Sequence, residues 1–166
     1  IRGCVANVTK EEEVKEALDR LGTPNVLVNN AGIVRFGPLI EQSVEDFIST
    51  VNINLIGTYI VSRETATRMQ GQNGHIINIS SISGIVAGWN TAAYNSSKAG
   101  VRLLSKSVAL YCAKKGYDVR CNSVHPAFVN TPILDPIKQA FGAEEAVAKL
   151  ARQIPMNKIG DTDDVS

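Results

Sequence analysis

The segment HIINISSISGIVAGWNTAAYNSSK, residues 75–98, decides how the rest of this sequence is interpreted. Residues 76–79 form a short apolar run bounded by polar residues, which is typical of a buried parallel strand. A helical pattern begins near Tyr94 and continues beyond the segment. Ser81 therefore follows the carboxyl end of the strand, where open α/β sheets place their ligands. The segment predicts a strand, a polar turn and a long helix arranged around a ligand site.

Tyr94 and Lys98 are four residues apart, so on a helix they share one face, one turn apart. An ammonium in that position lowers the pKa of a nearby phenol by stabilising the phenolate. Such a tyrosine can exchange a proton with a substrate hydroxyl, and Ser81 could hydrogen-bond the same oxygen. A solvated surface pair and a serine that caps a turn would show the same spacing, so the catalytic interpretation needs further motifs.

The composition is that of a globular protein: of 166 residues, 44% are hydrophobic and 20% are charged, with a net charge of +1. This near-neutral balance gives no electrostatic reason to expect a nucleic acid or an anionic membrane as partner. No apolar run approaches the length of a membrane span. Cys4, Cys112 and Cys121 form no C-x-x-C motif, which indicates reduced thiols in a cytoplasmic protein. His75 and His125 lack a second ligand at metal spacing, so no metal site is expected.

Strand-like and helix-like segments alternate along the chain. The expected strands are residues 1–8, 25–28, 76–79 and 119–124. The expected helices are residues 9–21, 43–51, 55–69 and 95–114. Thr9 and Ser43 are expected to cap the first two helices, and Gly116 to end the last. This alternation predicts the α/β class, with a Rossmann-type, doubly wound parallel sheet that has helices on both faces.

Residues 131–159 are too long and too apolar for a plain connector. Their helical middle, residues 143–153, favours a flexible cover over a substrate site. Residues 160–166 resemble a helix start with no helix after it, and the chain begins within a strand-like run. We therefore expect residues 1–166 to be one partial domain of a longer protein.

Four motifs together resemble the signatures of the short-chain dehydrogenase/reductase family. They are Asn29-Asn30-Ala31-Gly32, Asn54-Leu55-Ile56-Gly57, Ser81 with Tyr94 and Lys98, and residues 122–131 (NSVHPAFVNT). One such motif would be weak evidence, but four in the family's order and spacing are specific. The resemblance covers essentially the whole chain. Residues 116–126 are similar to bacterial hydroxysteroid and secondary-alcohol dehydrogenases.

The sequence departs from the family pattern in three places. Ala127 replaces the usual glycine after Pro126, and Asn7 stands where many members have aspartate. Residues 1–166 contain no T-G-x-x-x-G-x-G turn, the loop that brings a helix amino terminus to a pyrophosphate. The resemblance therefore implies a first β-α-β unit before residue 1, and a last helix and strand after residue 166. The missing strands are expected to lie between the ones present.

The resemblance implies reversible hydride transfer between a secondary alcohol or ketone and a nicotinamide cofactor, NAD or NADP. In the implied roles, Tyr94 exchanges the proton, Lys98 lowers its pKa and binds the nicotinamide ribose, and Ser81 polarises the substrate oxygen. Asn54 would hold a water that links Lys98 to solvent. The implied cofactor-binding residues are Asn7, Val8, Asn30, Ala31, Gly32, Tyr94, Lys98, Pro126, Val129 and Thr131.

Apolar residues such as Val86 and Trp89, with those in 131–159, favour a hydrophobic, secondary or cyclic alcohol or ketone as substrate, although they could equally pack the cover onto the core. Two alternatives stay open. A 3-oxoacyl carrier protein reductase would need a basic patch, of which Lys114 and Lys115 beside Arg102 and Lys106 form a thin version. A non-catalytic binding or assembly module would need no cofactor. The family also implies, by analogy, a homodimer or homotetramer. The helix faces suited to that contact carry Leu103, Val108, Leu110, Ile60 and Val61.

Overall fold

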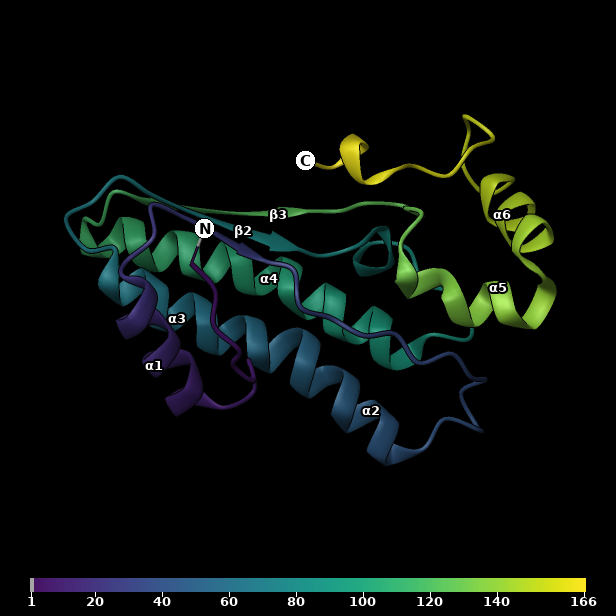
Figure 1. Ribbon diagram of the computed structural model, residues 1–166, viewed down its shortest axis with the longest axis horizontal. Helices are drawn as coiled ribbons and strands as arrows, with labels where there is room; N and C mark the ends of the chain where they lie inside the picture. The colour runs from purple at the N-terminus through teal and green to yellow at the C-terminus, as the bar shows by residue number, and fades with distance from the viewer. Residues whose placement is uncertain (1) are drawn as a thin grey trace. The chain divides into compact units, whose positions relative to one another are not determined.

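The computed structural model describes residues 2–166 and divides into two compact units between His125 and Pro126. The first unit contains a parallel sheet of three strands in the order β1-β2-β3 (Figure 1). The strands are β1 (Val26–Asn29), β2 (Gly74–Ile79) and β3 (Val119–Val124). Asn29 lies opposite Asn78, and Ile79 lies opposite Val124, so the carboxyl ends of the strands align. The α/β class and three of the expected strands are confirmed.

Two expectations about the sheet are wrong. Residues 2–8 form no strand. The three strands are also direct hydrogen-bonded neighbours, so no further strand fits between them. The reason is that each crossover in this unit moves the chain to the adjacent position of the sheet, which is the commonest connection in parallel sheets.

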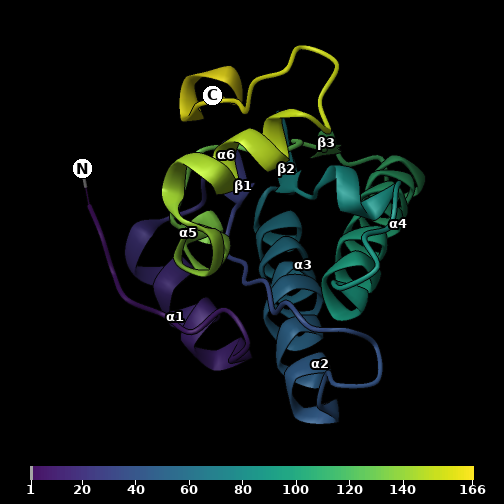
Figure 2. The same cartoon turned by 90° about the vertical axis from the view of Figure 1, so that its right-hand side faces the viewer.

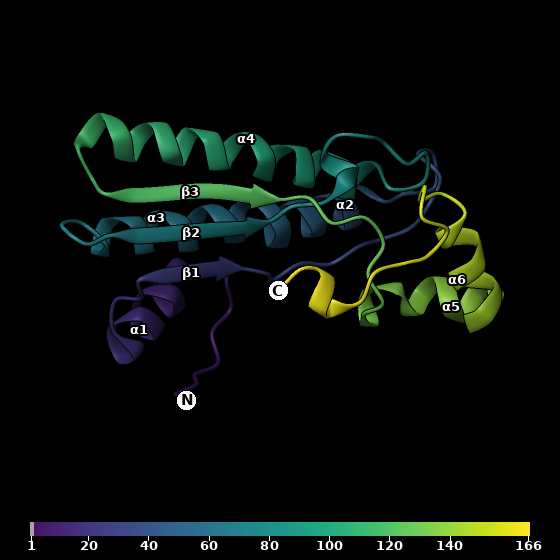
Figure 3. The same cartoon turned by 90° about the horizontal axis from the view of Figure 1, so that it is seen from above.

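The helices of the first unit lie on one face of the sheet, not on both. They are α1 (Glu11–Leu21), α2 (Val44–Val51), α3 (Thr58–Arg68) and α4 (Ala92–Lys115). Seen end-on, α1, α3 and α4 all lie below the strands (Figure 2), and α3 and α4 run alongside them (Figure 3). Right-handed crossovers that advance in one direction place every helix on the same face. The three described strands therefore correspond to one half of a doubly wound sheet, in which the chain advances across the sheet in a single direction. Helices would cover the second face only if the chain reversed that direction.

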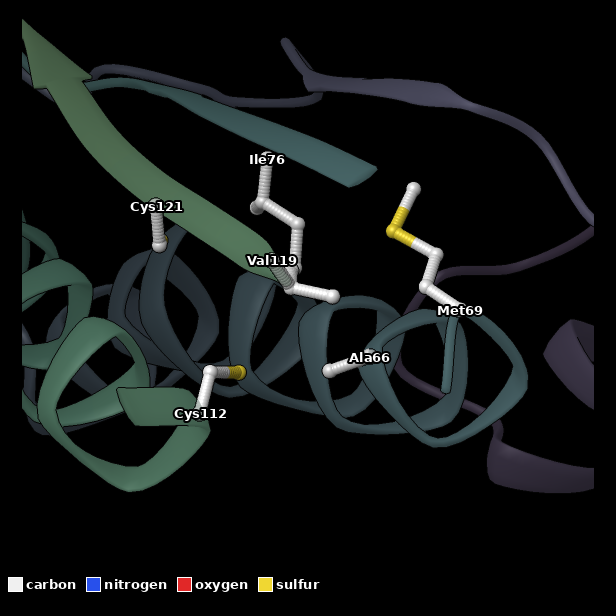
Figure 4. Close-up of a cluster of buried hydrophobic side chains, with 6 residues drawn as sticks. All are labelled: Ala66, Met69, Ile76, Cys112, Val119 and Cys121. Carbon is white, nitrogen blue, oxygen red and sulfur yellow. The ribbon is translucent and has the colours of Figure 1, made fainter. Parts of the chain in front are cut away.

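The core lies between the sheet and helices α3 and α4. Its buried members are Ala66, Met69, Ile76, Cys112, Val119 and Cys121 (Figure 4). Gly74 shows how closely these layers pack, because a Cβ there would lie 2.7 Å from the Met69 sulfur. Cys112 and Cys121 are buried free thiols, as the sequence predicts. They therefore serve here as small apolar side chains.

Local signals set two of the three predicted helix ends. The Ser43 hydroxyl accepts a hydrogen bond from the Asp46 N–H at 3.0 Å, and Gly116 ends α4 with a positive φ of 70°, both as predicted. The predicted Thr9 cap is wrong, since α1 begins at Glu11. The Thr9 hydroxyl donates instead to Asn7 Oδ1 at 2.8 Å. A local Asx-type turn thus competes successfully with helix capping.

The second unit consists of short helices and one isolated β-bridge. Its elements are η3 (Pro132–Leu134), α5 (Asp135–Phe141), α6 (Ala143–Ala151) and η4 (Thr162–Asp164). Val129 pairs with Gly160 in a parallel bridge, and Asp161 and Asp164 form a capping box at η4. The predicted helix at 143–153 is confirmed, whereas α5 was not predicted. Within residues 2–166, no helix is both long and apolar enough to cross a membrane.

Candidate active site

Ser81 occupies the second position after the carboxyl end of β2. It is buried and serves as the amino-terminal cap of the short turn η2 (Ile82–Gly84), where its hydroxyl oxygen accepts the Ser83 N–H at 3.0 Å. Its carbonyl oxygen accepts two hydrogen bonds, from the Gly84 N–H at 2.9 Å and from His125 Nδ1 at 3.0 Å. The backbone of Ser81 is therefore held firmly, while its hydroxyl proton stays free to be donated.

Tyr94 and Lys98 lie one turn apart in the first two turns of α4. The Lys98 ammonium is 5.6 Å from the centroid of the Tyr94 ring, and it donates a hydrogen bond to the Ile79 carbonyl at 2.8 Å. Lys98 is 5% exposed. The Ser80 hydroxyl donates to the Lys98 carbonyl at 2.8 Å. The end of β2 is thus fixed to the helix that carries both side chains.

The ionisation of this pair differs from the sequence-based expectation. Burial raises the pKa of Tyr94, and a hydrogen bond with the Ser81 side chain opposes that rise. Burial also lowers the pKa of Lys98 to about 8. The expected lowering of the phenol pKa by Lys98 is therefore not found in this structure. Burial is the largest cause of both pKa shifts, and the Lys98 ammonium bonds the Ile79 carbonyl.

Asn54 is completely buried in a π-helical turn, η1 (Asn52–Gly57), between α2 and α3. Its Oδ1 accepts the Ile33 N–H at 2.8 Å, and its Nδ2 donates to the Ile33 carbonyl at 2.9 Å and to Ser97 Oγ at 3.0 Å. The Asn54 side chain therefore joins the loop after β1 to helix α4. A single π turn inside a long helix often accompanies a functional residue, because it changes the direction of one side chain.

Gly32 lies close to the side chains of both Asn54 and Lys98. A Cβ at Gly32 would lie 3.3 Å from Asn54 Oδ1 and 3.5 Å from Lys98 Nζ. Asn30 and Ala31, next to it in the loop after β1, are exposed. The first residue of the motif, Asn29, points elsewhere. Its Nδ2 donates to Asn78 Oδ1 at 2.8 Å within the sheet.

The remaining predicted cofactor residues lie in other parts of the chain. Asn7 uses its Oδ1 to accept from the Thr9 N–H at 3.0 Å, and Val8 packs closely on Gly57. Pro126, Val129 and Thr131 belong to the second unit. There Val129 takes part in the bridge to Gly160, and Thr131 precedes η3.

Three contacts at the site could not be found from sequence. Ser97 binds the Asn54 amide, Ser80 binds the Lys98 carbonyl, and His125 binds the Ser81 carbonyl. In the sequence each is a common polar residue, and its partner lies between 18 and 44 residues away. Among residues 2–166, no group of three or more His, Cys, Asp or Glu side chains is placed to hold a metal ion.

Comparisons with known proteins show which family the chain resembles. A family model described as "Enoyl-(Acyl carrier protein) reductase" matches residues 2–166. The chain is 39% identical over 150 residues to the NADP-dependent (R)-specific alcohol dehydrogenase of Lentilactobacillus kefiri, covering 89% of this chain and 58% of that protein. It is 41% identical over 115 residues to the 3-beta-hydroxysteroid dehydrogenase of Comamonas testosteroni, covering 69% of this chain and 45% of that protein. The chain thus spans about half the length of these relatives.

A solved structure is also similar. The ligand-free aldohexose dehydrogenase of Thermoplasma acidophilum superposes with a TM-score of 0.85 at 32% sequence identity, covering 93% of this chain and 64% of that one. The family match extends over all the residues that the structure describes, and the relatives are dehydrogenases by name. The chain belongs to the short-chain dehydrogenase/reductase family.

Proposed function

We propose that the protein carrying this chain is an NAD(P)-dependent oxidoreductase that interconverts a hydrophobic secondary alcohol and the matching ketone. The observation that carries this proposal is the arrangement of Ser81, Tyr94 and Lys98. The serine follows the end of β2, and the other two share one face of α4 beside it. A hydroxyl donor, a half-buried phenol and a buried ammonium at the carboxyl end of a parallel strand are suited to proton exchange with a substrate oxygen.

In this proposal Tyr94 is the general acid and base. During reduction its hydroxyl donates a proton to the carbonyl oxygen of the substrate, and during oxidation the phenolate takes the proton back. The raised pKa of Tyr94 keeps the phenol protonated at neutral pH, which is the form that reduction needs. Ser81 donates a hydrogen bond to the same substrate oxygen and stabilises the charge that develops there.

Lys98 and Asn54 support the proton transfer. With its pKa lowered to about 8, Lys98 is close to the protonation equilibrium that a proton relay requires. Asn54 Oδ1 accepts one hydrogen bond and can accept a second, so it can hold a water beside Gly32 and Lys98. We propose that this water returns protons from solvent to Lys98 and Tyr94.

The surroundings of Lys98 fit a nicotinamide cofactor, NAD or NADP. Among residues 2–166, Lys98 Nζ makes one hydrogen bond, to Ile79, which leaves two N–H donors for ribose hydroxyls. The absence of a side chain at Gly32 leaves space beside this ammonium. The cofactor supplies the hydride when it is bound. We propose the same cofactor-binding set as the sequence analysis: Asn7, Val8, Asn30, Ala31, Gly32, Tyr94, Lys98, Pro126, Val129 and Thr131.

A hydrophobic substrate is supported by the loop between Ser81 and Tyr94. Val86 and Trp89 in this loop are 63% and 78% exposed, and large exposed apolar side chains commonly mark a contact surface. By their names, the two relatives are an (R)-specific alcohol dehydrogenase and a 3-beta-hydroxysteroid dehydrogenase. We propose that residues 131–159 form the cover of this substrate.

A thioester carried by an acyl carrier protein is the second candidate substrate, because the matching family model is described as an enoyl-(acyl carrier protein) reductase. The two candidates separate in one assay, in which a cyclic ketone and a 3-oxoacyl thioester are compared as substrates of the whole protein. A higher kcat/KM for the ketone supports the proposal. A higher kcat/KM for the thioester overturns the proposed substrate class but leaves the proton chemistry intact.

The catalytic assignment is tested by Tyr94→Phe, which removes the hydroxyl and keeps the ring. We expect kcat to fall by roughly 10²–10⁴-fold, the usual contribution of a general acid or base. The matched control is Tyr111→Phe, because Tyr111 is also on α4 but is 54% exposed and packs edge-to-face on Tyr117. Full activity in Tyr94→Phe would overturn the mechanism. If the parent protein also failed to bind either cofactor, a non-catalytic module would be the better interpretation.

We further propose a cytoplasmic homodimer or homotetramer. Leu103 and Leu110 on α4 are 57% and 72% exposed, which supports a subunit contact on that helix. Ile60, however, is buried within the chain, so the sequence-based assignment of Ile60 to a contact face is wrong. Its neighbour Tyr59 is exposed on α3 instead.

A further inference from the structure

His125 makes two hydrogen bonds at the end of β3. Its Nδ1 lies 3.0 Å from the Ser81 carbonyl oxygen, and its Nε2 lies 2.9 Å from Ser123 Oγ. A carbonyl oxygen can only accept, so Nδ1 carries the proton. In the neutral ring Nε2 then accepts from the Ser123 hydroxyl. These two contacts fix both the tautomer and the orientation of the imidazole.

The Ser81 carbonyl is the point at which this ring meets the candidate active site. Its other hydrogen bond comes from the Gly84 N–H, within the same turn. Among residues 2–166, His125 makes the one side-chain hydrogen bond from another element to the Ser81 backbone. The imidazole therefore ties the turn after β2 to the adjacent strand.

The direction of the Ser81 hydroxyl depends on this backbone. The hydroxyl oxygen accepts the Ser83 N–H at 3.0 Å, so the turn η2 and the side chain move together. If the peptide that follows Ser81 rotated, the hydroxyl would turn away from Tyr94. Displacements of this size at a reacting group are costly, because a misplacement of about 1 Å can cost roughly 10²-fold in rate.

We infer that His125 is a positioning residue for the reaction. Through Nδ1 it holds the Ser81 backbone so that the Ser81 hydroxyl points at the substrate oxygen. This inference rests on the proposed function, because it assigns to Ser81 the polarisation of that oxygen. His125 itself touches neither substrate nor cofactor in this assignment.

Two amide substitutions at His125 separate its contact with Ser81 from its contact with Ser123. His125→Asn keeps a donor at the δ position, where it can still reach the Ser81 carbonyl, whereas His125→Gln moves the amide to the ε position, near Ser123. We expect His125→Ala to lower kcat roughly tenfold with KM little changed, as expected when a group that acts in the transition state is misplaced. We expect His125→Asn to stay within about threefold of the parent, and His125→Gln to behave like His125→Ala.

A double-mutant cycle shows whether the effect passes through Ser81. In a Ser81→Ala background, His125→Ala should lower kcat no further, because the group that it positions is already gone. Independent, multiplying effects would overturn the inference, and so would a His125→Gln variant as active as the parent.

A measurement on the unmodified protein needs neither activity nor a variant. Nitrogen NMR of the ring should show His125 as the Nδ1–H tautomer, and the Gly84 amide should exchange slowly with solvent. An Nε2–H tautomer would overturn the inference. If Tyr94→Phe kept full activity while the ring was the Nδ1–H tautomer, the proposed function would fail and the link from His125 to Ser81 would stand.

Discussion

Lys98 shows that one residue can be unfavourable for the fold and useful for the site. Lys98 is 5% exposed, and its ammonium forms one hydrogen bond, to the Ile79 carbonyl. Burial lowers the pKa of Lys98 from 10.5 to about 8, so the charged form is less stable in the folded protein than in the unfolded chain. The folded protein keeps this charge at neutral pH at a cost in stability. We interpret that cost as the consequence of placing a cation beside Tyr94.

Lys98→Met should therefore stabilise the fold and inactivate the protein. Between pH 8 and 10.5 the unfolded state binds more protons at Lys98 than the folded state, so the free energy of unfolding of the parent rises with pH across that window. At pH 7 we expect the variant to be more stable by about 2 kcal/mol, allowing for the lost bond to Ile79. The advantage should shrink as the pH approaches 10.5. Urea unfolding of both proteins at several pH values measures it, and an advantage that does not change with pH would contradict this account.

Helix α4 receives its amino-terminal cap from a distant residue. Thr91, at the capping position, makes no capping hydrogen bond with its own side chain. Gln42, from the loop before α2, accepts the Ala93 N–H at 3.2 Å and donates to the Arg35 carbonyl at 3.4 Å. The first turn of α4, which contains Tyr94, is thus connected to a loop 51 residues earlier.

Gln42→Ala should loosen that first turn. We expect a loss of about 1 kcal/mol in the free energy of unfolding, the usual effect of removing a helix cap. Gln42→Glu is the matched control, because a carboxylate still accepts at a helix amino terminus and interacts well with the helix dipole. Thermal unfolding compares the two variants. Equal losses in both would mean that the acceptor at residue 42 does not matter.

A second contact fixes the distance between α4 and the turn after β2. A Cβ at Gly84 would lie 2.8 Å from the Lys98 carbonyl oxygen, so the turn packs directly on the helix backbone. Gly84→Ala should push them apart and cost roughly 1–3 kcal/mol in stability, with a lower kcat. Gly37→Ala is the control, because a Cβ there meets no atom within 4 Å. If the Gly84 and Gly37 variants were equally stable, the close packing would not constrain the site.

At the scale of the whole molecule, the sequence predicts those features of the structure that depend on residues close together in the chain. The apolar run before Ser81 predicts β2, and the spacing of Tyr94 and Lys98 places both on one face of α4. The bonds that Gln42 and His125 make across 51 and 44 residues have no local signal. The strand order is also not local, and the strands expected between those present, on the basis of the family resemblance, are absent from the described sheet. The pKa of Tyr94 was misjudged because burial appears only in the fold.

We propose that this chain contributes the catalytic groups of a nicotinamide-dependent dehydrogenase. The most direct test supplies the whole protein with a cyclic ketone and with reduced nicotinamide that carries deuterium at both positions of C4. We predict an alcohol product with a single deuterium on the carbinol carbon, formed in proportion to the cofactor oxidised. Alcohol without deuterium, or oxidised cofactor without alcohol, would contradict the account.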